Sequence, residues 1–179
     1  ALLIVPLCVI YSWNHFPAPS AVHILCRAVA DISRIEVPKT PKTTYNVGVI
    51  HGGTTVNTIA SAAEMLLDMR SVDMRSLADL ERSALAIIER QAKEGEGQAT
   101  LELVGDRPAG VIPADHPLVQ LCTSIYQAFD ITTSSKAAST EANVPLSMGI
   151  PAVCLSVTSG ENEHRPDEFI ETAPLATGL

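Results

Sequence analysis

The sequence TYNVGVIHGGTTVNTIASAAEMLLDMR, residues 44–70, contains two extended segments separated by a pair of glycines. The first segment, Thr44–Ile50, is rich in valine and other β-branched residues, which favour strands. In the second, apolar residues at 63, 65, 67 and 69 alternate with the residues at 64, 66, 68 and 70. A period of two gives a strand one wholly apolar face. The stretch therefore predicts two strands, interrupted at His51, Gly52 and Gly53.

Helical patterns lie on both sides of these strands. Apolar residues at 22, 25, 29 and 32 recur at helical spacing, which predicts an amphipathic helix over about 20–34. A second helix is expected from a capping-box-like start formed by Ser76 with Asp79, and Gly95 is its expected stop.

Two further strands complete the first domain. The apolar run Ala1–Ile10 is shorter than the roughly 20 residues of a membrane span and is expected to be a buried strand. Ala99–Val104 is expected to be a fourth strand. The order β-α-β-β-α-β predicts an α+β domain over residues 1–106, with two helices on one face of an antiparallel sheet.

Residues 107–179 follow a Gly/Pro-containing linker and have a different pattern. A helix is expected over about 117–129, and a short helical stretch near 141–148. Pro151–Val157 is an unbroken apolar run, typical of a strand buried on both faces of a parallel sheet. One strand with two helices cannot close a core, so this second domain is expected to be an incomplete α/β segment.

Composition excludes several classes of partner. The net charge of −8 and the absence of clustered Lys and Arg argue against nucleic acid. No membrane span or export signal is visible, which predicts a cytoplasmic location, and the lack of an initiator Met suggests that position 1 is not a natural start. The four cysteines are scattered, as expected of isolated buried thiols.

Asn57 and Arg70 are candidate ligand-binding residues. Both lie on the extended segments of residues 44–70, which could be neighbours in one sheet. The planar fork of Arg70 matches a carboxylate, and Asn57 would add a donor beside it. The alternative is that Arg70 forms a surface ion pair with Asp68 or Asp73.

His164 is a candidate metal ligand. It lies in a Gly-containing loop after the apolar run Pro151–Val157, where open α/β sheets carry their sites. A neutral imidazole can bind zinc, yet zinc sites use three or four ligands, and the other histidines show no matching spacing. The chemistry of the residues alone therefore does not decide whether His164 is a metal ligand.

Three strings in this order resemble the M20 family of metallopeptidases. The first, HGGTTVNTIASAAEMLLDMRS, is similar to the family's lid or dimerisation domain, where a Gly-Gly-Thr turn leads to an Asn and later to Asp-x-Arg. The other two, STEANVPLSMGIPAV and SGENEHRPDEF, look like the closing segment of its catalytic domain. The resemblance covers essentially the whole chain, as lid domain plus the end of a catalytic domain.

The resemblance implies a role for each matching residue. It makes His164 the C-terminal ligand of a two-zinc centre, and Asn57 and Arg70 the lid residues that hold the substrate's carboxylate, often in the partner subunit's site. Gly160 matches the loop that lines the substrate pocket. The family's Ser/Thr-Asp-Ala-Asn turn corresponds to Thr140, Glu141 and Asn143, with Glu141 in place of the commoner Asp.

Two departures from the family pattern stand out. Tyr11 occupies the place of a lid His that stabilises the oxyanion; a Tyr hydroxyl can donate a hydrogen bond there, but not as an imidazolium. His15 is a weaker substitute. The family's His-x-Asp motif, bridging Asp and Glu pair are not found in the sequence. A metal-activated water needs several ligands and a base, so the chain alone is expected to be inactive.

Two functional hypotheses follow. The first is a fragment of a di-zinc hydrolase that cleaves an amide or peptide bond next to a carboxylate, in a small peptide or an N-acyl amino acid. The second is a non-catalytic dimerisation or ligand-binding module derived from the same family. The resemblance also implies a homodimer formed through the lid domain.

Overall fold

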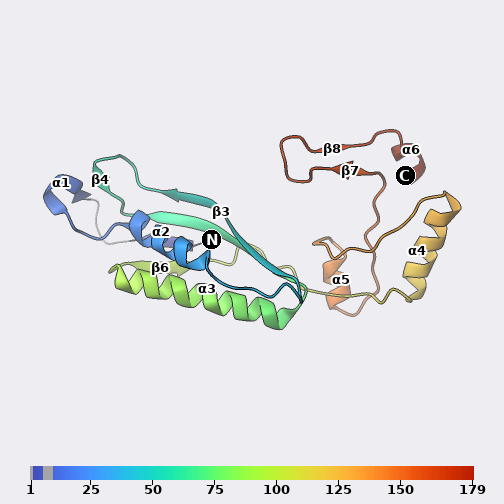
Figure 1. The fold of residues 1–179 in the computed structure, drawn as a ribbon, viewed down its shortest axis with the longest axis horizontal. Coiled ribbons are helices and arrows are strands. Elements are labelled where there is room, and N and C mark those ends of the chain that lie inside the picture. Colours follow the sequence, from blue (N-terminus) through green and yellow to red (C-terminus); the bar gives the residue numbers. More distant parts are fainter. Residues whose placement is uncertain (1, 6–9) are drawn as a thin grey trace. The chain divides into compact units, whose positions relative to one another are not determined.

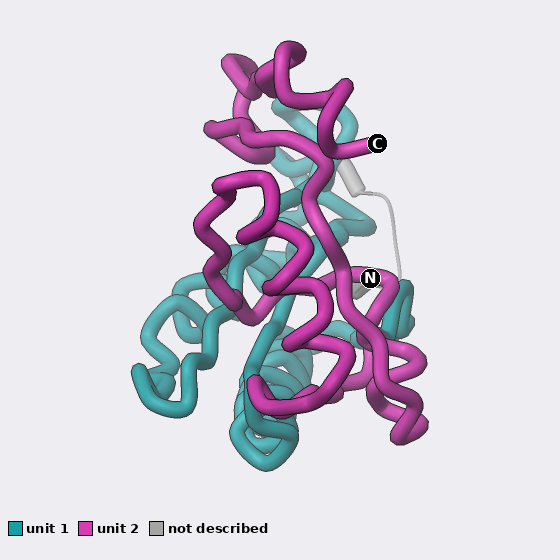
Figure 2. Tube along the Cα trace, turned by 90° about the vertical axis from the view of Figure 1, so that its right-hand side faces the viewer, with its two compact units in different colours: residues 1–106 teal, residues 107–179 magenta. Residues whose placement is uncertain are grey.

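The structure is a computed structural model that describes residues 2–5 and 10–179. It divides into two compact units, Ala1–Asp106 and Arg107–Leu179, shown in different colours in Figure 2. The first unit confirms the expected mixture of helices with a small antiparallel sheet (Figure 1).

Four strands form this sheet, in the order β3-β5-β1-β6, and every neighbouring pair is antiparallel. Their bounds are Leu2–Val5 for β1, Thr43–Gly52 for β3, Ala63–Ser71 for β5 and Gln98–Leu101 for β6. The β1 strand falls within the expected run of residues 1–10, of which residues 1 and 6–9 lie outside the described part. The β6 strand ends at Leu101, three residues before the predicted end at Val104.

The long pairing of β3 with β5 contains a β-bulge. Register shifts between Val47, opposite Leu67, and Val49, opposite Leu66, so Gly48 is left without a partner. The extra residue reverses the alternation of β3: Val47 lies on the side of the buried β5 residues, whereas Val49 lies on the other side. Beyond the bulge it is Ile50, opposite the buried Met65, that lies on the side of the helices.

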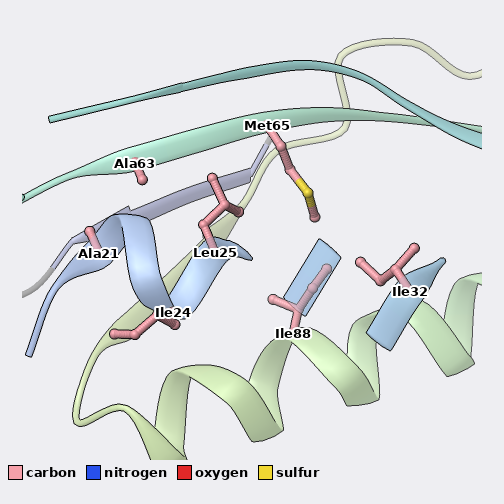
Figure 3. Close-up of a cluster of buried hydrophobic side chains, with 7 residues drawn as sticks. All are labelled: Ala21, Ile24, Leu25, Ile32, Ala63, Met65 and Ile88. Carbon is pink, nitrogen blue, oxygen red and sulfur yellow. The ribbon is translucent and has the colours of Figure 1, made fainter. Parts of the chain in front are cut away.

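Two helices, α2 (Ala21–Ile32) and α3 (Met74–Glu94), pack on one face of the sheet. Figure 3 shows side chains of both helices meeting those of β5 in the core. The buried cluster consists of Ala21, Ile24, Leu25, Ile32, Ala63, Met65 and Ile88. Because no aromatic residue belongs to it, close packing of aliphatic side chains provides most of the stability of this unit.

One buried polar side chain joins the two helices. Gln91 of α3 is 6% exposed, accepts from Arg27 Nε at 3.2 Å and donates to Asp31 Oδ2 at 2.9 Å. Arg90 also donates to Asp31 Oδ2, at 2.7 Å. Both polar groups of the amide therefore have partners, so its burial costs little and fixes how α2 and α3 meet.

The start of α3 differs from the prediction. The helix begins at Met74, and its N-cap is Asp73, whereas Ser76 with Asp79 was expected to form the start. Ser76 is instead the residue whose backbone N–H the cap satisfies. The end is as predicted, since Gly95 is the C-cap.

A smaller pair of strands lies beside the main sheet. The two-residue strands β2 (Ile10–Tyr11) and β4 (Thr58–Ile59) pair antiparallel, and α1 (Ser12–His15) follows β2 directly. This pair extends the first unit at the end where β3 leads into the Gly52–Gly53 turn (Figure 1).

The second unit has short elements and no buried side chain anywhere in residues 107–179. Its helices are α4 (Pro117–Ala128), α5 (Asn143–Ser147) and α6 (Leu175–Gly178), and β7 (Gly160–Glu161) pairs with β8 (Phe169–Ile170). The predicted strand Pro151–Val157 is wrong: these residues form no strand, because no neighbouring strand in this unit supplies ladder hydrogen bonds.

The structure also tests what the sequence predicted for the cysteines and for a membrane-spanning helix. Cys26 and Cys154 are exposed and Cys122 is half-buried, so the expectation of buried thiols is wrong for these three residues, and Cys8 lies outside the described residues. None of the helices in the described part of the chain is long and apolar enough to cross a membrane.

Candidate functional site

Tyr11 and Asn57 lie at the same end of the first unit. Tyr11 pairs with Thr58 across β2 and β4, next to Asn57 in the chain. The carbonyl of Asn57 accepts from the backbone N–H of Ser12 at 3.0 Å and from its Oγ at 2.9 Å. The Asn57 Oδ1 accepts from Thr55 Oγ1 at 3.0 Å, which leaves the amide nitrogen without a partner among the described residues. Only the backbone of Tyr11 is described.

Close packing and backbone conformation explain the two glycines that precede Asn57. A Cβ on Gly52 would lie 2.8 Å from both the Ala63 Cβ and the Val22 Cγ2, so only glycine lets β3 approach β5 and α2 this closely. Gly53 has a φ of +77°, which L-residues rarely adopt. Beside this turn is an open hollow of about 380 Å³, lined by Ser20, Val22, His23, Gly52, Gly53, Thr54, Thr55, Val56, Thr58 and Ala60.

Arg70 lies near the far end of β5. It is opposite Thr44 of β3, on the sheet face turned away from the helices, and its side chain is 63% exposed. Its Nε donates to Asp68 Oδ2 at 2.7 Å, which is one of the two surface pairings that the sequence allowed. The terminal guanidinium nitrogens have no partner among the described residues, so they remain available to an anion.

The structure does not bring Asn57 and Arg70 together. Asn57 lies outside the four-stranded sheet, near the Ala63 end of β5, where Gly53 N donates to Ala62 O at 3.3 Å. Seven steps along β5 separate Ala63 from Arg70, which is about 23 Å at strand spacing. A single carboxylate spans only a few ångströms, so these two residues of one chain cannot bind the same carboxylate.

His164 is presented by a hairpin loop between β7 and β8. It is an exposed residue with φ 66°, a left-handed conformation that is uncommon outside glycine. Hydrogen bonds hold the loop: His164 N donates to Glu168 Oε2 at 3.2 Å, and Arg165 donates to both oxygens of Asp167 at 2.9 and 3.0 Å. The imidazole has no partner among the described residues and is available as a ligand.

The turn that contains Thr140, Glu141 and Asn143 is fastened to the linker. Asn143 Oδ1 accepts from Thr140 N at 2.8 Å, and its amide donates to Pro108 O at 3.2 Å. Arg107 lies 3.6 Å from a carboxylate oxygen of Glu141. In this structure both the oxygen and the nitrogen of the Asn143 side chain therefore bind backbone atoms, and the side chain does not point to a ligand.

Gly160 is closely packed against the neighbouring strand. It pairs with Ile170, and a Cβ there would lie 2.5 Å from the carbonyl oxygen of Phe169. Glycine is therefore required by the hairpin itself, whether or not it also lines a pocket.

The described residues do not form a metal site by themselves. No three His, Cys, Asp or Glu side chains among them come together as a group that could hold a metal ion. His164 would supply one imidazole nitrogen, whereas catalytic zinc sites use three protein ligands. Zinc thus does not fit the donor set of these residues alone.

Pairing of the strands reveals side chains that the sequence motifs did not single out. Thr44 lies directly opposite Arg70, and Asn46 lies opposite Asp68, all on the face away from the helices. Thr44 and Asn46 were not recognised as site candidates, because their positions beside Arg70 depend on a register that the sequence does not specify.

Comparison with known proteins gives a consistent result. The family model of the peptidase dimerisation domain, M20_dimer, matches residues 12–96. Acetylornithine deacetylase from Erwinia tasmaniensis is 31% identical over 134 residues, which cover 74% of this chain and 34% of that protein. The same enzyme from Edwardsiella ictaluri is 32% identical over 133 residues, with the same coverage. The chain therefore spans about a third of the length of the curated relatives it matches.

Solved structures share the fold at lower sequence identity. Aminopeptidase PepT from Bacillus cereus has a TM-score of 0.73 and 23% identity, over 99% of this chain and 48% of that one. A tripeptidase from Staphylococcus aureus has a TM-score of 0.77 and 22% identity, over 98% and 46%. The match to the M20 peptidase dimerisation domain and the deacetylase relatives support a relationship of this chain to the M20 metallopeptidases, and the solved structures show a shared fold.

Proposed function

We propose that this chain is the dimerisation (lid) domain, residues 1–106, and the C-terminal catalytic segment, residues 107–179, of an M20-type hydrolase. The reaction is cleavage of an amide or peptide bond next to a substrate carboxylate. The observation that carries the proposal is Arg70 on the sheet face away from the helices: its terminal nitrogens have no partner among the described residues and match a carboxylate in shape and charge. The sequence relatives, named as deacetylases of acetylornithine, favour an N-acyl amino acid or a small peptide as substrate.

The second unit supports its assignment as a catalytic segment that needs further protein around it. Residues 107–179 have no buried side chain, and large apolar side chains stay exposed there, including Val111 at 85% and Met148 at 69%. A folded domain buries such groups, since contiguous exposed apolar surface is costly. We infer that the rest of a catalytic domain packs against this unit in the working enzyme.

The role proposed for His164 is that of one metal ligand. His164 is exposed at the end of a hairpin and its imidazole has no partner among the described residues, so it can join ligands from outside this chain. Zinc would supply a Lewis acid and an activated water when bound. The chain's own part is to orient the imidazole and to bind the substrate's carboxylate, and on its own it should not hydrolyse substrate.

Separation of the substrate-binding residues favours a shared site in a homodimer. Tyr11 and Asn57 lie at one end of the first unit, whereas Arg70 lies about 23 Å along β5 from that end. We propose that Arg70 binds substrate in one active site and that Tyr11 and Asn57 reach the site of the second subunit. The M20 dimerisation-domain match to residues 12–96 supports the homodimer.

A complementation experiment tests the proposed hydrolase. The chain is mixed with the leading part of Erwinia tasmaniensis acetylornithine deacetylase and zinc, and hydrolysis of N-acetylornithine is measured. Activity is expected from the mixture and from neither part alone, and His164→Ala in the chain should abolish it. A well-formed complex, seen by gel filtration, without activity would contradict the proposal.

The alternative is a non-catalytic dimerisation or ligand-binding module. Two observations favour it: the family model matches residues 12–96, and no group of three or more His, Cys, Asp or Glu side chains comes together among the described residues. This alternative predicts a stable dimer of the chain and an inactive complex in the complementation experiment. The first hypothesis predicts the same dimer with activity, so the catalytic assay decides between them.

A further inference from the structure

The sheet face opposite the helices carries a compact polar group around Arg70. Thr44 and Arg70 are directly paired on β3 and β5, and Asn46 and Asp68 form the next pair on the same face. Directly opposed residues have Cβ atoms about 4.5–5.5 Å apart. This register puts the Thr44 side chain next to that of Arg70 on the same face of the sheet.

Asp68 restrains the guanidinium at one edge only. The Nε of Arg70 donates to Asp68 Oδ2 at 2.7 Å, a short charge-assisted hydrogen bond between residues two apart on one strand face. Asp73, the other acidic residue nearby, caps α3 through Ser76 and does not compete for Arg70. The two terminal nitrogens have no partner among the described residues, and their parallel N–H groups match the two oxygens of a carboxylate.

The hydrogen bond contributes little to folding. Arg70 is 63% exposed and Asp68 is 53% exposed, and ion pairs in such positions stabilise proteins only slightly. An arginine side chain, by contrast, loses much rotamer freedom when it binds a ligand. Fixing Nε beforehand removes part of that entropic cost, so the main effect of Asp68 is on binding.

We propose that Asp68 is a positioning residue that holds Arg70 for two parallel hydrogen bonds to the substrate's carboxylate, with Thr44 donating a third from the opposite strand. This inference rests on the proposed function, because it takes Arg70 as the carboxylate-binding residue. Thr44 Oγ1 has no partner among the described residues, so its hydroxyl is available for this role.

Asp68 has two opposite effects on carboxylate binding, so the direction in which affinity changes when Asp68 is removed tests the proposal. As a negative charge beside the site, Asp68 repels a carboxylate, so its removal should tighten binding if charge were its only effect. As a positioning residue, its removal should weaken binding. Asp68→Asn keeps an oxygen that accepts from Nε and should restore part of the loss.

The experiment uses the 179-residue chain labelled with ¹⁵N, with N-acetylglycine as the probe at low ionic strength. The Arg70 Nε–Hε signal reports both binding and side-chain order. We expect Asp68→Ala to weaken binding about 3- to 10-fold and to make the Arg70 Nε more mobile, with Asp68→Asn in between. Thr44→Val should weaken binding about 2- to 5-fold without changing Arg70 mobility.

The matched control is Asp79→Ala, which breaks another exposed pair, Arg82 to Asp79 at 2.9 Å on α3. It should leave probe binding unchanged. Unchanged or tighter binding by Asp68→Ala overturns the positioning role, while Arg70 remains the binding residue. If Arg70→Ala binds the probe as the wild type does, the carboxylate-binding role of Arg70 fails, and the role of Asp68 fails with it.

Discussion

Asp73 Oδ2 accepts two hydrogen bonds from Ser76, one from the backbone N–H at 2.8 Å and one from Oγ at 2.9 Å. This arrangement begins α3 by satisfying one of the N–H groups that a helix leaves unpaired in its first turn. The same helix supplies Ile88 to the core and Gln91 to the contact with α2. Asp73→Ala is therefore expected to lower the melting temperature of the chain by a few degrees, measured by circular dichroism.

The same carboxylate predicts a pH dependence of stability. Hydrogen bonds from Ser76, first its backbone N–H and then its hydroxyl, hold the pKa of Asp73 below its usual value of 3.8. A carboxylate with a lowered folded-state pKa stabilises the fold fully above its unfolded pKa and loses this effect as pH falls through the folded pKa. The stability difference between wild type and Asp73→Asn should be constant near neutral pH and shrink below about pH 3.8. A difference that grows on acidification would contradict the cap.

Substitution in the core should have the largest effect on folding. Ile88 is 2% exposed and contacts the cluster formed by α2 and β5. Ile88→Ala is expected to lower the free energy of unfolding by about 2–5 kcal/mol, measured by urea denaturation. The control is Val56→Ala, because Val56 is fully exposed in the loop after Gly53 and its truncation should cost less than about 0.5 kcal/mol.

Gly52 should be sensitive to even one added methyl group. An alanine Cβ would collide with Ala63 on the paired strand and with Val22 of α2, so Gly52→Ala is expected to cost about 1–3 kcal/mol. The control is Gly105→Ala, since nothing lies within 4 Å of a Cβ at that position. Equal unfolding free energies for the two variants would show that β3 can move away from α2 without cost.

Mixing variants tests whether Asn57 and Arg70 serve different active sites. In the complemented enzyme described above, Asn57→Ala and Arg70→Ala should each be strongly impaired. A heterodimer of the two has one site with both residues intact, provided that each site takes Asn57 from the second subunit. Random pairing of equal amounts makes half the dimers heterodimers, so activity should recover to about a quarter of wild type. If activity does not recover after subunit exchange, each active site takes Asn57 and Arg70 from the same subunit.

Much of the first unit could be predicted because its signals are local. The alternation of residues 63–70 predicts β5, and the helical spacing around Leu25 predicts α2 within two residues at each end. The end of α3 at Gly95 is also predicted correctly, although Gly95 has an ordinary φ of −92° and the left-handed residue is Glu96. Each of these features depends on residues only a few positions apart, so the sequence alone reveals it.

Pairing and burial could not be predicted in the same way. The sequence suggested that Asn57 and Arg70 were neighbours, yet the bond that places Asn57 joins it to Ser12, 45 residues away. Pro151–Val157 has the composition of a buried strand but lacks a strand to pair with. The position of Thr44 beside Arg70 depends on the register of β3, which the bulge at Gly48 shifts in its other half. Such relationships depend on long-range contacts, and no local pattern contains them.

The bulge in β3 also affects how the protein resists assembling into fibres. β3 is a ten-residue strand at the edge of the sheet, with neither Pro nor a Lys, Arg, Asp or Glu to discourage another chain from pairing with it. At Gly48 the unpaired residue shifts the backbone donors and acceptors out of step between the two halves of the strand. An incoming straight strand can therefore match one half only, so continuous stacking of one copy on the next stops at Gly48.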